Sequence, residues 1–355
     1  MRNNRITLSM FIVLFLALLI PALTAAEDSE IPQTGLEIRN DGSWTTHQEE
    51  LDFLQELSEK SERMEYSVYG ESAEGRPMHL VRVGYPAPPP DEEIAEGRNI
   101  FIVGTFHGNE PSGREMSLKL MRDLAFTDDP ELIDLMSKST ILFLPTMNPD
   151  GREANRRRNN DNFDLNRDAV TMVTPEGQTI AKIQNEFKPD IILDAHERIS
   201  GPNISVLGNL NLNVDSDLRA LNHELLDDYM IPDLKDAGFT ADYYPPGALP
   251  ANTRSMSGLR HSIGVLTEGS WTDEPLVRVA GQMESAYSIL NFYMERFDEV
   301  GEVVEQSRLN RKQAGADRSE PFYLDGMEGS LPSDDRYILD PPPYGYLINE
   351  AKKER

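Results

Sequence analysis

The chain has 355 residues, enough for one large α/β domain or two smaller ones with a full hydrophobic core. Its 61 acidic residues outnumber 34 basic ones, and the net charge of −27 argues against nucleic acid or an anionic membrane as a partner. The sequence contains no cysteine, which excludes disulfides, a catalytic thiol and cysteine-ligated metal. Any bound metal therefore needs histidine, aspartate or glutamate ligands.

The amino terminus has the pattern of a signal peptide. Arg2 and Arg5 precede an apolar run over residues 8–19, and small residues at 24–26 offer a cleavage site. We expect a signal peptide at 1–26, a leader at 27–45, and a secreted or periplasmic mature protein without stable membrane association after cleavage. An uncleaved anchor is the alternative.

The mature chain alternates between strand and helix patterns, which predicts an α/β fold with a mixed, mostly parallel twisted sheet and helices on both faces. We assign a catalytic domain to residues 46–300 and expect residues 301–355 to be an irregular extension. The extension would hold a short extra strand or the beginning of a further domain. The predicted elements are an edge hairpin at 66–69 and 78–83, strands at 99–103, 140–144, 190–195 and 263–267, and helices at 49–62, 114–124, 175–187, 215–237 and 276–297.

Polar side chains stand where the predicted strands end. His107 and Glu110 lie three positions apart in a glycine-containing turn after the strand at 99–103. His196 and Glu268 end two later strands. Ligands of parallel sheets bind at the carboxyl ends of the strands, and an imidazole and a carboxylate this close can hold one face of a zinc ion. A polar surface turn, a structural histidine and a surface glutamate are the simpler interpretations.

A basic segment interrupts the acidic chain after the strand at 140–144. Five arginines lie between Arg152 and Arg167. In a pocket these side chains would attract a carboxylate or stabilise a developing oxyanion, and on the surface they would form a solvated loop.

In this order, the motifs resemble the zinc carboxypeptidases related to carboxypeptidase A. The resemblance covers residues 51–297 and implies the architecture of that family. It rests on Tyr69-Gly-Glu-Ser-Ala-Glu-Gly-Arg-Pro77, His107-Gly-Asn-Glu110, Asn148-Pro-Asp-Gly151, Asp164-Leu-Asn-Arg167 and Asp194-Ala-His196.

The resemblance implies roles for individual residues. One zinc ion would be held by His107, Glu110 and His196, with Asp164 orienting the first histidine and Glu268 acting as the general base. The remaining matches are Asn166 and Arg167 at the terminal carboxylate of the substrate, Arg157 or, as second choice, Arg158 at the oxyanion, and Tyr244 or Tyr243 over the substrate.

The function that these matches imply is that of a secreted zinc metallocarboxypeptidase, which hydrolyses the C-terminal bond of a peptide or acts on an N-acyl amino acid. A zinc-dependent deacylase or a cell-wall peptide amidase on the same scaffold is one alternative. An inactive binding module is another, although it would require the loss of the base or of a ligand. The sequence between His196 and Glu268 contains no motif that indicates side-chain specificity.

Overall fold

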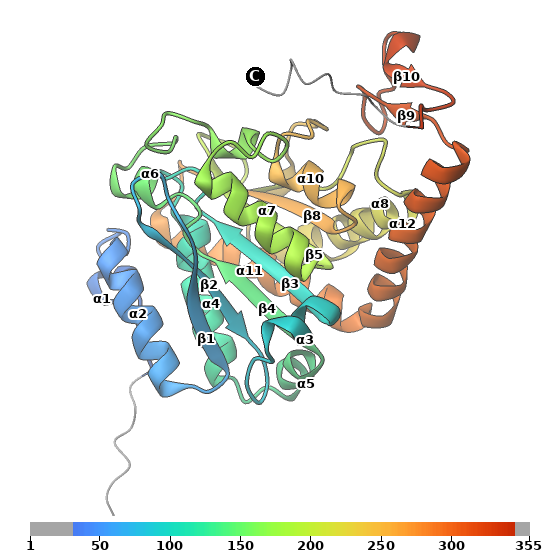
Figure 1. The fold of residues 1–355 in the computed structure, drawn as a ribbon. Helices are drawn as coiled ribbons and strands as arrows, with labels where there is room; N and C mark the ends of the chain where they lie inside the picture. The colour runs from blue at the N-terminus through green and yellow to red at the C-terminus, as the bar shows by residue number, and fades with distance from the viewer. Residues whose placement is uncertain (1–30, 345–355) are drawn as a thin grey trace, which may run out of the picture. The chain divides into compact units, whose positions relative to one another are not determined.

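A computed structural model describes residues 31–344 of the chain (Figure 1). The predicted signal peptide at 1–26 lies outside the described residues. Residues 27–30 of the expected leader and the tail at 345–355 also lie outside them. None of the helices within residues 31–344 is long and apolar enough to cross a bilayer.

An eight-stranded sheet forms the centre of the fold, with the strand order β1-β2-β4-β3-β5-β8-β6-β7. The pairs β3–β4, β3–β5, β5–β8 and β6–β7 are parallel, and the pairs β1–β2, β2–β4 and β6–β8 are antiparallel. This confirms the predicted mixed, mostly parallel sheet. The strands are β1 (Met64–Glu71), β2 (Pro77–Val83), β3 (Arg98–Gly104), β4 (Ser139–Leu144), β5 (Ile191–Arg198), β6 (Ile204–Leu207), β7 (Ala241–Tyr243) and β8 (Ile263–Ser270).

Helices cover both faces of the sheet, as Figure 1 shows. They are α1 (Gly35–Arg39), α2 (His47–Lys60), α3 (Asp91–Glu96), α4 (Ser112–Phe126), α5 (Pro130–Lys138), α6 (Pro149–Glu153), α7 (Pro175–Phe187), α8 (Ser216–Glu224), α9 (Ile231–Asp236), α10 (Thr253–Leu259), α11 (Pro275–Glu295) and α12 (Phe297–Asp317). A π-helical segment, Leu225–Met230, joins α8 to α9, so the helix predicted at 215–237 is continuous.

Two hydrophobic cores lie on opposite faces of the sheet because side chains alternate along a strand. In β3, Ile100 and Ile102 belong to the larger core, which includes residues of α2, α4, α8 and α11. Phe101 and Val103 belong to the smaller core, which includes residues of α3 and α7. Burial on both faces explains why the central strands read as continuous apolar runs and were predictable.

Several short elements were not predicted. The strands β6 and β7 have four and three residues, too few to show a period, and α10 has seven. The leader expected over 27–45 contains the short helix α1, whose first turn is capped by Thr34.

The expectation of irregular chain beyond residue 301 was wrong for the residues up to Asp317. Helix α12 runs through them and buries Val300 and Val304. Its apolar stripe is narrow and its other faces are charged, so its composition resembles that of a solvated segment. Beyond the helix, the strands β9 (Phe322–Tyr323) and β10 (Ile338–Leu339) form a small separate sheet. The domain boundaries themselves stay predictions.

Helix α12 should contribute to stability through its buried stripe. Val304 is 1% exposed and Leu309, on the same helix, is 50% exposed. Val304→Ala should lower the free energy of unfolding by about 1–3 kcal/mol, because it removes buried methyl groups and leaves a cavity. Leu309→Ala should change it by less than about 0.5 kcal/mol. Urea unfolding measures both values, and equal effects would contradict the packing of α12.

Candidate metal centre

The chain leaves β3 through a strained turn that is held against the end of β4. Thr105 has φ +56°, a left-handed conformation that a β-branched residue adopts only at an energetic cost. The N–H groups of Met147 and Asn148 donate to the carbonyl oxygens of Gly104 and Thr105 at 3.1 and 3.0 Å. These bonds fix the backbone just before His107 at the carboxyl edge of the sheet.

Two of the sequence motifs interlock at this edge. A Cβ added to Gly108 would come within 1.9 Å of the carbonyl carbon of Gly151, so the contact requires glycine. The side chain of Asn148 donates to the carbonyl oxygens of Phe106 and Arg157 at 3.1 and 3.2 Å. The loop that carries Arg157 is therefore fixed to the turn that carries His107 and Glu110.

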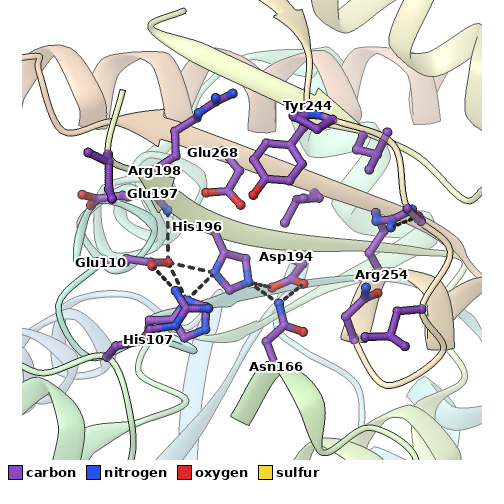
Figure 2. A pocket seen from close by; sticks show the side chains of 18 of the residues that line it. His107, Glu110, Asn166, Asp194, His196, Glu197, Arg198, Tyr244, Arg254 and Glu268 are labelled. Carbon is purple, nitrogen blue, oxygen red and sulfur yellow. Dashed lines mark hydrogen bonds and ion pairs between the residues drawn. The ribbon is translucent and has the colours of Figure 1, made fainter. Parts of the chain in front are cut away.

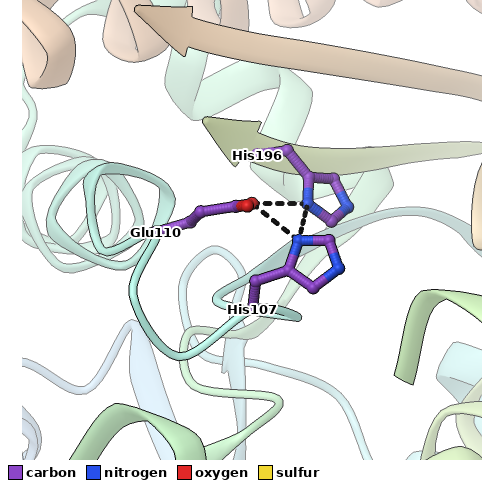
Figure 3. Close-up of side chains that lie close together, drawn as sticks. All are labelled: His107, Glu110 and His196. Atoms are coloured by element: carbon purple, nitrogen blue, oxygen red, sulfur yellow. Dashed lines mark hydrogen bonds and ion pairs between the residues drawn. The ribbon is translucent and has the colours of Figure 1, made fainter. Parts of the chain in front are cut away.

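The structure brings His107, Glu110 and His196 together, as predicted (Figure 3). One potential ligand atom of each residue lies within 4.8 Å of the others. Glu110 Oε2 is 2.8 Å from His107 Nδ1 and 2.9 Å from His196 Nδ1, and the two Nδ1 atoms are 3.1 Å apart. All three side chains are buried.

A carboxylate faces the other nitrogen of each imidazole. Asp164 Oδ1 is 3.1 Å from His107 Nε2, and Asp194 Oδ1 is 2.7 Å from His196 Nε2. The carboxylate of Asp164 favours a proton at Nε2 of His107 and so leaves the Nδ1 lone pair of that ring free. The two Nδ1 atoms and Glu110 Oε2 converge on one point, where they can hold a cation among them. The donor set fits zinc, which prefers nitrogen and oxygen ligands of this kind.

The charges of the three side chains depend on one another. Burial opposes the ionisation of Glu110, but the two adjacent histidines outweigh it and lower its pKa to about 2. Burial also opposes a charge on His196, but Asp194 and Glu110 raise its pKa well above the usual value.

Glu268 stands beside His196 because their strands pair in register, residue for residue. Figure 2 shows its carboxylate in the pocket above the histidine. The side chain is 8% exposed and has no hydrogen-bond partner among the described residues. Burial raises its pKa from 4.5 to about 8. The neighbouring Glu197 differs, because it accepts hydrogen bonds from Ser112 N at 2.6 Å and Arg278 at 2.5 Å.

These residues line a cavity of about 650 Å³, within the size range of small-molecule sites. Arg157 lines it and contacts Glu110 Oε1 at 3.2 Å and Asp164 Oδ2 at 3.1 Å. Arg158 does not line this cavity and donates to the carbonyl oxygen of Asn162 at 2.9 Å. Of the two arginines considered for the oxyanion, the structure brings only Arg157 to the site.

Asn166 and Arg167 both line the cavity, but the amide of Asn166 is engaged. Its Oδ1 accepts a hydrogen bond from Thr253 N at 2.9 Å, and its Nδ2 lies 2.8 Å from His196 Nε2 and 3.4 Å from Asp194 Oδ2. Arg167 donates one bond, to the backbone oxygen of Asn166 at 2.5 Å. Arg167 is thus the better placed of the two to bind a ligand.

Tyr244 lines the cavity, and the ring lies 5.2 Å from the guanidinium of Arg198. Tyr243 instead donates its hydroxyl to Asp227 at 2.6 Å and is 41% exposed. The structure therefore favours Tyr244 as the residue that covers the site.

The cavity residues to which the sequence analysis assigned no role include Asp194, Arg198 and Arg254. Asp194 could have been found, because it lies two positions before His196 on the same face of a strand. Arg198 and Arg254 follow no motif, and their proximity to the centre depends on tertiary structure.

Comparisons with known proteins agree with this geometry. Residues 50–190 match the zinc carboxypeptidase family model. The chain is 30% identical over 294 residues to a protein named probable carboxypeptidase 2 from Arthroderma benhamiae, covering 74% of this chain and 52% of the relative. It is 33% identical over 156 residues to carboxypeptidase E of Caenorhabditis elegans, covering 36% of this chain and 32% of the relative. The chain thus spans about half the length of the first relative.

Solved structures show the same fold. A metallo-carboxypeptidase from Pseudomonas aeruginosa has a TM-score of 0.60 at 19% identity, covering 72% of this chain and 69% of that chain. Carboxypeptidase A from Helicoverpa armigera has a TM-score of 0.55 at 16% identity, covering 74% of each chain. The resemblance of this chain to the zinc carboxypeptidases is confirmed in sequence and in fold.

The buried carboxyl of Glu268 should make the stability of the metal-free protein depend on pH. Its folded pKa, about 8, exceeds the ordinary value of 4.5, so between these values the folded state keeps a proton that the unfolded chain has lost. The free energy of unfolding should therefore fall as the pH rises, by up to about 1.4 kcal/mol per pH unit from this group. Glu268→Gln replaces the titrating carboxyl group by a neutral amide and should remove this contribution to the pH dependence.

Urea unfolding of both proteins in the presence of a chelator, at several values from pH 5 to 7.5, measures this effect. The variant should gain stability relative to the wild-type protein as the pH rises. A constant difference across the range would show that Glu268 titrates normally.

Proposed function

We propose that the chain is a zinc-dependent carboxypeptidase that removes the last residue of a peptide. The observation that carries the proposal is the convergence of His107, Glu110 and His196 within 4.8 Å, next to the buried Glu268 in one cavity. A single zinc ion at this centre would polarise the scissile carbonyl and lower the pKa of a bound water.

Glu268 acts as the general base in this proposal. A carboxylate whose pKa lies near neutrality can accept a proton from the attacking water and return it to the leaving amine. Burial raises the pKa of Glu268 to about 8, and the positive charge of a zinc ion at the centre would lower it toward neutrality, so that the ionised carboxylate could accept the proton. The side chain has no competing hydrogen bond within residues 31–344, so its oxygens are free to accept the proton.

Arg157 and Arg167 supply positive charge at two points of the substrate. Arg157 lies against Glu110 Oε1 at 3.2 Å, with a side chain that is 45% exposed, so it can turn toward an oxygen that becomes negative during the attack. Arg167 has N–H groups left for a bidentate bond to the terminal carboxylate. Tyr244 covers the bound residue, and Asp164 and Asp194 keep the two imidazoles oriented.

Export of the chain is part of this proposal. It rests on the signal-peptide pattern at 1–26, which lies before the described residues. The substrate would then be an extracellular or periplasmic peptide.

Blocking the terminal carboxylate tests the proposal. Conversion of a good peptide substrate to its C-terminal amide should lower kcat/KM by roughly one to two orders of magnitude. The reason is that Arg167 is exposed, and a hydrogen bond to a charged group typically contributes about 1.5–3 kcal/mol, at about 1.36 kcal/mol per decade. Arg167→Ala should reduce the difference in kcat/KM between the free-acid peptide and its amide.

Arg156→Ala is the matched control, because Arg156 belongs to the same segment but donates to Asn160 and does not line the cavity. This variant should keep the full preference for the free acid. Equal cleavage of the free-acid peptide and its amide by the wild-type protein would refute the proposed carboxypeptidase activity. It would favour an amidase or deacylase on this scaffold.

A further inference from the structure

The cavity contains a buried cation that the proposed function does not use. Four arginines line it, and Arg157 and Arg167 already have roles. Arg198 donates to Ser205 Oγ at 2.9 Å and stacks against Tyr244. Arg254 remains, and at 3% exposure it is a deeply buried member of the cavity wall. Figure 2 shows it on the side away from His107.

Arg254 has no carboxylate within ion-pair distance among residues 31–344. Its guanidinium donates to the backbone oxygens of Gly208 and of Gly247, the latter at 2.6 Å, and the other N–H groups have no partner in that part of the chain. Asp194 attracts it at longer range, but that carboxylate is 2.7 Å from His196 Nε2. Burial lowers the pKa of Arg254 to about 10, so the side chain is still charged at neutral pH.

The backbone of Arg254 is fixed in place. The preceding residue, Thr253, donates its N–H to Asn166 Oδ1 at 2.9 Å. Helix α10 packs closely on β8, because a Cβ added to Gly264 would come within 2.5 Å of Arg254 O. Asn252 caps the helix by accepting a hydrogen bond from Ser255 N at 2.9 Å. The cation is therefore held in position relative to both the metal centre and Asn166.

Part of the cavity wall is apolar, since Leu207, Leu249 and Leu266 line the same cavity as Arg254. Methylene groups can pass along such a wall and end at a guanidinium. A buried charge without a counter-ion is costly, and an anionic ligand that reaches it removes part of that cost. A carboxylate fits best, because it can accept two parallel bonds from a guanidinium.

We propose that Arg254 binds a second carboxylate, carried by the side chain of the substrate's terminal residue, and so selects acidic residues such as glutamate. This inference rests on the proposed function and names its substrate class. The terminal carboxylate is assigned to Arg167, so the two anionic groups of one residue have separate partners.

Matched peptides that end in glutamate, glutamine or leucine test the selection. The wild-type protein should favour glutamate over its neutral isostere glutamine by roughly 10²-fold or more in kcat/KM, since a site built for a polar group rejects the analogue that lacks it. Arg254→Gln should abolish this preference while cleavage of the glutamine peptide continues. Arg254→Lys, which keeps a cation, should retain part of it. Arg198→Gln, the matched arginine of the same cavity, should keep the ratio.

A structural role alone predicts another pattern. If Arg254 only ties Gly208 and Gly247 together, Arg254→Gln would lower cleavage of all three peptides equally, and the wild-type protein would show no glutamate preference. Either result overturns the inference. If free-acid peptides ending in leucine or glutamine are cleaved better than the glutamate peptide, the proposed carboxypeptidase activity is supported and the proposed role of Arg254 is refuted.

Binding provides a readout that does not depend on turnover. Calorimetry of the zinc-loaded protein should show tighter binding of L-glutamate than of L-glutamine, and Arg254→Gln should remove the difference. This measurement decides the inference even if no peptide is hydrolysed. Equal affinity of the wild-type protein for the two amino acids would refute it. Thermal unfolding of each variant shows whether it is folded.

Discussion

Two buried imidazoles that turn the same nitrogen toward one another need a cation between them. His107 and His196 do this with their Nδ1 atoms 3.1 Å apart, beside the carboxylate of Glu110. Asp164 and Asp194 enforce the arrangement from the far side of each ring. The arrangement is costly without a metal, and the rest of the carboxyl edge is built to maintain it. The strained turn at Thr105 and the Gly108–Gly151 contact fix the first histidine.

Sequence motifs from separate parts of the chain meet at this same edge of the sheet. Asp150, from the Asn-Pro-Asp-Gly turn, accepts hydrogen bonds from Ser72 Oγ at 2.7 Å, Glu74 N at 3.0 Å and Arg76 at 2.6 Å. These donors belong to the turn between β1 and β2, far from the metal centre in sequence. The hairpin motif thus supports the loop that carries Arg157, and its contribution to the site is structural.

Charge is distributed unevenly between the surface and the cavity. The chain has a net charge of −27, yet four arginines line one cavity together with the carboxylates of the metal centre. The cavity lining balances its four arginines with four acidic side chains, so it is less acidic than the surface, which repels anionic substrates at long range. Selection of a substrate with two carboxylates would be consistent with the number of cations in that cavity.

The sequence predicted the parts of the molecule that local pattern determines. The central strands were predictable because burial on both faces leaves apolar runs, and His107, Glu110, His196 and Glu268 because each follows such a run. Helix α12 was missed beyond residue 301 because only a narrow stripe of it is buried. Arg254 was missed because its burial depends on α10 packing on β8, and a seven-residue helix has no periodic signal. Tertiary contacts, which the sequence does not display, make these residues functional.

The zinc content of the purified protein tests the central claim most directly. Elemental analysis should find one zinc ion per chain in the wild-type protein. His196→Ala should contain much less zinc, because the substitution removes one of the two histidine ligands. His223→Ala is the matched control, since His223 contacts Glu328 at 2.8 Å, away from the cavity, and this variant should keep its zinc. Equal zinc in His196→Ala and the wild-type protein would contradict the account.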